Sequence, residues 1–265
     1  MPCNYSTIGL SAESSEEIDA LMESVYQQAQ TIECNKVSYR KWHANGAEVW
    51  LHIGDNGEIK GMTPSFFGKS KVDVGITGLV AGDSNSEFEV SLHCWAEPNS
   101  NADHGAYPFI FELVNKAQYR NLEFPFFTTA TISAFAHHIE VYQDERDFEQ
   151  SQIQNIPFAA KSFIPSGLFM GEDQGIPPLA VATFSGEVIE HQVITNELSG
   201  KSFQWILVDT LGGIFDVVAD EELISRDIEV GNIISGTFGL IGQIALEPQQ
   251  RPSLKKGFLS RLFNR

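Results

Sequence analysis

The chain has 265 residues, with 35 acidic and 17 basic side chains and a formal net charge of −18. A surface this acidic repels phosphate backbones, so nucleic acid is excluded as the expected partner. The chain contains no run of 18 apolar residues, and we therefore expect no helix that crosses a bilayer.

Cysteine usage points to a reducing compartment. Cys3, Cys34 and Cys94 are odd in number and widely spaced, which favours free thiols over a disulfide framework. The first residues show no basic stretch followed by an apolar run, so no signal peptide is expected. Together these features predict a cytoplasmic protein.

The first elements should be a strand over residues 6–10 ("STIGL") and then a helix. Ser14 with Glu17 fits the capping box that starts many helices. Apolar residues then recur at helical spacing and predict one buried face: Ile18, Leu21, Met22 and Val25.

Two Asn-Gly pairs, at Asn45-Gly46 and Asn56-Gly57, predict hairpin turns, because these residues tolerate the positive φ of a type I′ turn. The flanking segments predict a meander of strands at about 37–43, 47–53 and 59–62. In the middle strand, Ala47, Val49, Leu51 and Ile53 should face one way, and Glu48, Trp50 and His52 the other.

Further strands are predicted near 72–80, 87–96, 108–114 and 127–142. A segment rich in Gly and Pro at 164–178 predicts a boundary between two domains. We therefore divide the chain into a sheet-rich domain at 1–160, a linker at 161–178, a second domain at 179–248 and a basic tail at 249–265.

The second domain begins with a long strand that contains Gly186, a candidate bend or bulge. A strand at 202–211 follows, then a turn at Gly212-Gly213, another strand, a short helix at 221–227 and a last strand pair from Gly231. This order resembles the OB-fold, a small five-stranded barrel. Residues 179–250 carry 11 acidic and 2 basic side chains, which favours a protein partner over nucleic acid.

The segment "FFGKS" at 66–70 invites comparison with a phosphate-binding loop. That loop requires a glycine at position 63, which is Thr63 here. We therefore interpret the segment as a surface turn.

A set of polar strand residues is a candidate metal site: His52, His93, His138 and Glu140. If the polar faces of their strands converge, the four residues form a cup that could hold a divalent metal. The alternative is that strand alternation alone places these residues on exposed sheet faces. The β-α-β-β-β order of residues 1–65 also resembles half a module of the vicinal-oxygen-chelate fold, which implies a metal in such a cup.

The C-terminal segment "LKKGFLSRLFNR", residues 254–265, has the pattern of an interfacial helix. Phe258, Leu259, Leu262 and Phe263 form an apolar arc, flanked by four basic residues: Lys255, Lys256, Arg261 and Arg265. "KKGFLSRLF" resembles the membrane-targeting segment of the MinD family of division-site ATPases, which implies a reversible anchor at the inner leaflet. The alternative is a chain end that docks on its own domain or on a partner, or that has no fixed structure.

These features predict an α+β protein that is mostly β, with an N-terminal β-α-β-meander sheet domain followed by an OB-like small β-barrel. The expected function is a non-catalytic binding or adaptor protein without a cofactor, with a protein partner and a weak membrane tether. It would be cytoplasmic and peripheral at the inner face of the membrane. The alternative is a metal-dependent enzyme, or a metal-binding protein, that uses the His/Glu cup.

Overall fold

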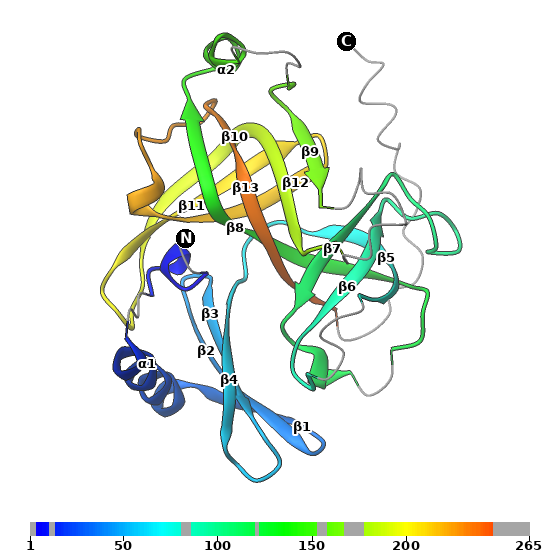
Figure 1. Ribbon diagram of the computed structural model, residues 1–265, viewed down its shortest axis with the longest axis vertical. Helices are drawn as coiled ribbons and strands as arrows, with labels where there is room; N and C mark the ends of the chain where they lie inside the picture. Colours follow the sequence, from blue (N-terminus) through cyan, green and yellow to red (C-terminus); the bar gives the residue numbers. More distant parts are fainter. Residues whose placement is uncertain are drawn as a thin grey trace.

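The computed structural model describes residues 4–10, 14–80, 86–119, 122–152, 158–166 and 178–245. These residues form a mostly β protein with one four-stranded and one nine-stranded sheet, as the predicted class requires (Figure 1).

The predicted first strand is wrong, because Ser6–Ile8 forms a 3₁₀ helix, η1. Gly9 has a φ of 77° and turns the chain at the end of this helix. The side chain of Asn196 donates a hydrogen bond to the carbonyl of Ile8, and Ser199 donates one to the carbonyl of Gly9. This segment therefore packs against a distant turn and pairs with no strand within the described residues.

Helix α1 (Ser15–Gln28) begins as the capping box predicts. The backbone N–H of Glu17 donates to the Ser14 hydroxyl, and the Glu17 carboxylate accepts from the backbone N–H of Ser14. Val25 is buried, and Leu21 and Met22 pack on the core, but Ile18 is exposed. The helix contacts the sheet over part of its predicted apolar face.

The four-stranded sheet consists of consecutive antiparallel strands: β1 (Gln30–Cys34), β2 (Val37–Ala44), β3 (Ala47–Ile53) and β4 (Ile59–Phe66). Asn45 and Gly46 both have positive φ, as the predicted tight turn requires, whereas the second connection spans residues 54–58, with only Gly57 at positive φ. All seven residues of β3 are buried. Helix α1 contacts β2 and β3, while Glu48 and His52 contact the larger sheet, so both faces of β3 are covered.

The larger sheet contains nine strands, three of them long. Their bounds are β5 (Val72–Leu79), β6 (Val90–Ala96), β7 (Tyr107–Leu113), β8 (Phe126–Tyr142), β9 (Ser162–Pro165), β10 (Val181–Thr195), β11 (Ser202–Thr210), β12 (Gly213–Asp220) and β13 (Ile233–Ile244). Short helices lie between some of them: η2 (Lys116–Gln118), α2 (Glu145–Ser151) and η4 (Glu221–Leu223). The helix predicted at 221–227 is therefore only the three-residue η4. Strand β10 has its bulge between Val188 and Glu190, just after Gly186.

The strand pairings close two rings that share β8 and β13. The first ring contains β5, β6, β7, β13 and β8 in that order, and the second contains β10, β11, β12, β8 and β13. In Figure 1 these two long strands run from one ring into the other. Closure leaves no open sheet edge within either ring.

Each ring contains one strand from the other half of the chain. Residues 126–130 of β8 pair with β5, but residues 133–135 run parallel to β12 in the second ring. Residues 233–239 of β13 pair with β10, but residues 241–242 run parallel to β7 in the first ring. Ser133 pairs with Ile241 at the crossover, so the two halves exchange their strands in the same way.

The exchanged strands connect the sequence ranges that were predicted to be separate domains. Strand β8 lies within residues 1–160 but closes a ring with strands from residues 179–248. Within the expected linker, β9 pairs with β10. The two sequence ranges are thus joined by strands that both rings share.

Two large apolar clusters hold these layers together. One is continuous through the interiors of both rings and includes Leu92, Ile132, Phe215 and Phe238. The other lies between the rings and the N-terminal elements and includes Val25, Trp50, Phe135 and Trp205. The four-stranded sheet is therefore fixed against the outside of the two rings.

Candidate functional site

The predicted membrane-binding residues all lie outside the described residues, which end at Ala245. They are Lys255, Lys256, Phe258, Leu259, Arg261, Leu262, Phe263 and Arg265. Among the described helices, none has both the length and the apolar character needed to cross a membrane.

The four predicted metal ligands occupy three separate environments. His52 is buried on β3 of the smaller sheet, and His93 lies on β6 of the first ring. His138 and Glu140 do lie together on the exposed side of β8, with 3.9 Å between Nε2 of the histidine and Oε1 of the glutamate. Within the described residues, no group of three or more His, Cys, Asp or Glu side chains could hold a metal. The strands carry their polar residues as predicted, but their polar faces do not converge into one cup.

His52 is packed between the smaller sheet and the first ring. Its ring stacks on Phe88, with 4.7 Å between the centroids, and its Nε2 lies 3.2 Å from the Thr63 hydroxyl. That hydroxyl donates to the Glu89 carboxylate. Burial lowers the pKa of His52 to about 4, because the charged imidazolium is poorly solvated there. A neutral His52 is thus part of the joint between the two sheets.

The segment that resembled a phosphate loop binds an anion of the protein itself. The backbone N–H groups of Lys69 and Ser70 donate to the carboxylate of Asp216, at 3.0 and 2.7 Å. The indole N–H of Trp205 is a third donor, at 2.8 Å. A Cβ on Gly68 would lie 2.1 Å from this carboxylate, so only glycine permits the approach. The fully buried Asp216 therefore ties the chain after β4 to β12 of the second ring.

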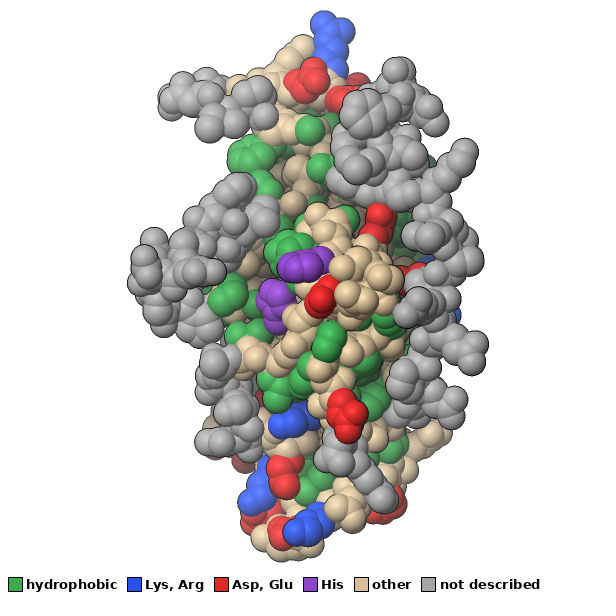
Figure 2. All heavy atoms as spheres, turned by 90° about the vertical axis from the view of Figure 1, so that its right-hand side faces the viewer, with side chains coloured by type: hydrophobic (Ala, Val, Ile, Leu, Met, Phe, Trp, Pro, Cys, Tyr) green, Lys and Arg blue, Asp and Glu red, His purple; other side chains and the backbone are tan. Residues whose placement is uncertain are grey.

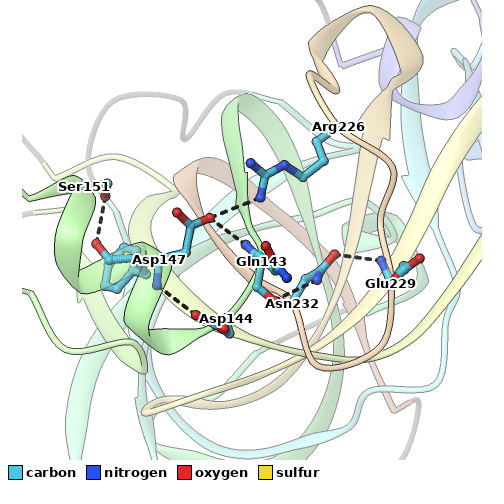
Figure 3. Close-up of polar contacts among 8 residues, drawn as sticks. Gln143, Asp144, Asp147, Ser151, Arg226, Glu229 and Asn232 are labelled. Carbon is cyan, nitrogen blue, oxygen red and sulfur yellow. Dashed lines mark hydrogen bonds and ion pairs between the residues drawn. The ribbon is translucent and has the colours of Figure 1, made fainter.

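A second polar network links α2 to the loop before β13 (Figure 3). The Asp147 carboxylate accepts from the backbone N–H of Gln143 at 2.8 Å and from Arg226 at 3.1 Å, and these contacts lower its pKa. The Asn232 side chain donates to the carbonyl of Gln143 and accepts from the backbone N–H of Glu229. These contacts fix the chain at one end of the second ring, and this structural role accounts for all of them.

An aromatic and imidazole cluster lies on the outer side of the first ring. Trp95 on β6 meets His93 edge to face, with 6.4 Å between centroids, and meets His104 in the same way at 5.4 Å. Nδ1 of His93 lies 2.6 Å from the Thr77 hydroxyl on β5. We call the surface formed by Thr77, His93, Trp95 and His104 the Trp95 face. Figure 2, which views the side where β5, β6 and β7 lie in Figure 1, shows histidine side chains beside hydrophobic ones.

The loop between β6 and β7 holds the Trp95 face in place. Ala102 of this loop is buried at a φ of 63°, and Glu97 has a φ of 45°. A Cβ on Gly75 would lie 2.5 Å from the carbonyl oxygen of Ala102, so the loop packs directly on β5. Non-glycine residues at positive φ carry a conformational cost and often occur at functional sites.

Sequence patterns could find only part of this face. Alternation along the strand places His93 and Trp95 on the same side of β6. His104 lies in the loop after the strand, where no periodicity exists, and Thr77 comes from a neighbouring strand. No family model, curated protein or solved structure matches this chain.

Proposed function

We propose that this protein is a non-catalytic binding or adaptor protein, built on two OB-like rings and weakly tethered to anionic membrane by its C-terminal segment. The observation that carries the binding role is the partly exposed Trp95 on the outer side of β6. The tether is supported by the amphipathic pattern of residues 254–265.

The OB-like assignment is supported by the order of elements in each ring. Each ring has three consecutive antiparallel strands, then a 3₁₀ helix and a fourth strand, and a fifth strand lies parallel to the third. In this arrangement the fifth strand is supplied by the other half of the chain. OB-folds bind their ligands on the face of strands 2 and 3.

The two rings differ in what covers this face. In the second ring it is formed by β11 and β12, and η1 and the 68–70 segment pack there against buried residues such as Phe203 and Trp205. In the first ring it is formed by β6 and β7 and carries the Trp95 face. We therefore assign partner binding to the first ring.

The partner class follows from charge. Strands β5 to β7 and the loop at 97–106 carry the carboxylates of Asp73, Glu97, Asp103 and Glu112 and no Lys or Arg. This charge opposes a phosphate backbone and favours a protein surface with basic residues.

The tether should be weak. Each basic residue near an anionic surface contributes about 1 kcal/mol, and each large apolar side chain about 1.5–3 kcal/mol if fully buried. Ordering the segment costs about 1 kcal/mol or more per residue. The balance is small, so binding should be reversible.

Cosedimentation with vesicles of anionic lipid tests the tether. Full-length protein should sediment with the vesicles, and a chain truncated after Gln250 should not. Added salt should weaken the binding because it screens exposed charges. Equal sedimentation of the two chains would contradict the proposal.

Two point variants sharpen this experiment. Leu262→Glu should abolish vesicle binding, because it removes an apolar anchor and places a negative charge in the buried arc. Ser260→Ala is the matched control, since it lies on the polar side and alanine favours the helix. Loss of binding in both variants would show that the predicted arc is not the contacting surface.

A further inference from the structure

We propose that the Trp95 face is the docking site for the chain's own basic segment, residues 251–265. The segment would then exchange between this face and the membrane, so docking would limit membrane binding. This inference concerns the regulation of the proposed tether, but the docking contact itself does not require a membrane.

Charge complementarity is the first support. Residues 251–265 contain five basic side chains and no acidic one. The strands and loop that surround Trp95 (72–79 and 90–113) contain carboxylates but no Lys or Arg. Opposite charges of this kind favour encounter and fix orientation, even where each exposed ion pair contributes little.

The chemistry of Trp95 is the second support. Tryptophan is the preferred ring for cation–π contacts, and arginine also stacks on aromatic faces. The imidazoles of His93 and His104 meet Trp95 edge to face, and Trp95 is still partly exposed to solvent. A segment with Lys, Arg and Phe side chains therefore suits both the charge and the aromatic character of this face.

The path of the chain is the third support. The described chain ends at Ala245, whose backbone N–H donates to the carbonyl of Thr129 on β8, and Thr129 pairs with Asp73 on β5. Trp95 pairs with Gly75, two residues further along β5, so it lies three strand spacings and two residues from Ala245, which corresponds to roughly 16 Å. The six residues from 246 to 251 can extend about 20 Å, so the basic segment starts within reach of Trp95.

Tryptophan fluorescence provides a direct test in the full-length chain. Trp42, Trp50 and Trp205 are at most 5% exposed, so Trp95 is the tryptophan that a neutral quencher such as acrylamide reaches best. A Trp95→Phe variant identifies its contribution to the signal. If the segment covers this face, Trp95 should be protected from acrylamide in the wild-type protein.

The test variant is the double substitution Lys255→Glu and Lys256→Glu. In the wild type, a short tether gives the segment a high effective concentration near Trp95, so even a weak contact stays formed. The charge-reversed segment should no longer make this contact, and the acrylamide quenching constant of Trp95 should therefore roughly double. The double substitution Lys36→Glu and Arg146→Glu is the matched control, with the same charge change elsewhere. Equal quenching of Trp95 in the wild type and the tail variant would overturn the docking proposal.

A vesicle assay separates this inference from the tether. In full-length protein, Trp95→Ala should increase the fraction bound to anionic vesicles at least about twofold, because the competing contact is lost. Near-UV circular dichroism of the variant checks that the ring remains folded. Protection of Trp95 without vesicle binding would refute only the tether, whereas vesicle binding with an unprotected Trp95 would refute only the docking.

Discussion

At the scale of single residues, the contact between Gly68 and Asp216 is tightly constrained. A fully buried carboxylate is costly unless its oxygen atoms accept hydrogen bonds. Here three N–H donors meet Asp216 at 2.7–3.0 Å, and two of them come from the backbone just after Gly68. Backbone N–H groups of this segment therefore bind an anion, as they do in a phosphate-binding loop, but the anion is the Asp216 side chain of the protein itself.

Gly68→Ala should strongly destabilise the protein. The added Cβ would lie 2.1 Å from the Asp216 carboxylate, so the loop must shift and its hydrogen bonds weaken. Losing donors to a buried charge costs about 1–3 kcal/mol or more in the free energy of unfolding. Urea denaturation measures this change.

Gly78→Ala is the matched control for that experiment. Its added Cβ would have no atom within 4 Å, and Gly78 is not at positive φ. The control should change the free energy of unfolding by less than about 1 kcal/mol. Similar stability of the two variants would contradict the structural role assigned to Asp216.

At the scale of elements, the joint between the smaller sheet and the first ring contains a titratable side chain. His52 on β3 contacts Thr63 on β4, and it stacks on Phe88, just before β6. The pKa of His52 is lowered to about 4 from an ordinary value of 6.5, because burial disfavours the charged form. The unfolded chain therefore binds a proton at His52 more readily than the folded protein does.

This difference predicts acid sensitivity. Because the folded pKa is the lower one, the free energy of unfolding falls as the pH drops from about 6.5 towards 4. A shift of this size corresponds to about 3 kcal/mol in total. His93 and His137 have lowered pKa values and contribute in the same direction.

A comparison with His52→Gln isolates the contribution of His52. The variant should show a shallower decrease in the free energy of unfolding between pH 6.5 and 4 than the wild type. Chemical denaturation at a series of pH values measures both slopes. Parallel slopes would show that His52 is not buried in its neutral form.

Local elements were largely predictable, because their signals are local. The capping box at Ser14 and the Asn45-Gly46 turn are encoded in adjacent residues, and both form as expected. The sequence of residues 6–10 predicts a strand, but Ser6–Ile8 forms a 3₁₀ helix, because the conformation of this segment depends on contacts with Asn196 and Ser199 far along the chain. The sequence also does not predict His104 as part of the Trp95 face, because only the fold of its loop brings His104 into contact with Trp95.

At the scale of the whole molecule, strand exchange is the feature that sequence patterns could not supply. Apolar alternation identified β8 and β13 as strands, but it says nothing about which partners each half of a long strand selects. Those partners are set by ring closure between segments about a hundred residues apart, such as Ser133 and Ile241. The four predicted metal ligands do not form one cup for a related reason. Alternation along a strand predicts which residues share a face, but it does not predict how the faces of different strands lie relative to one another.

The exchange predicts that cutting the chain between its halves will not separate them. We suggest inserting a specific protease site into the segment at 167–177 and cleaving the folded protein. The two fragments should elute together in gel filtration under native conditions, because β8 closes the second ring and β13 closes the first. Urea should separate them, since each ring loses a strand when the other half leaves.

The uncleaved protein with the inserted site is the control, and its elution volume should match that of the nicked complex. The halves share an apolar core that is continuous through both rings, so their separation would expose apolar surface on each. That exposure opposes dissociation at about 25 cal/mol per Å² of buried area. Fragments that elute separately without denaturant would show that the rings are complete within each half, and the shared-strand architecture would then be wrong.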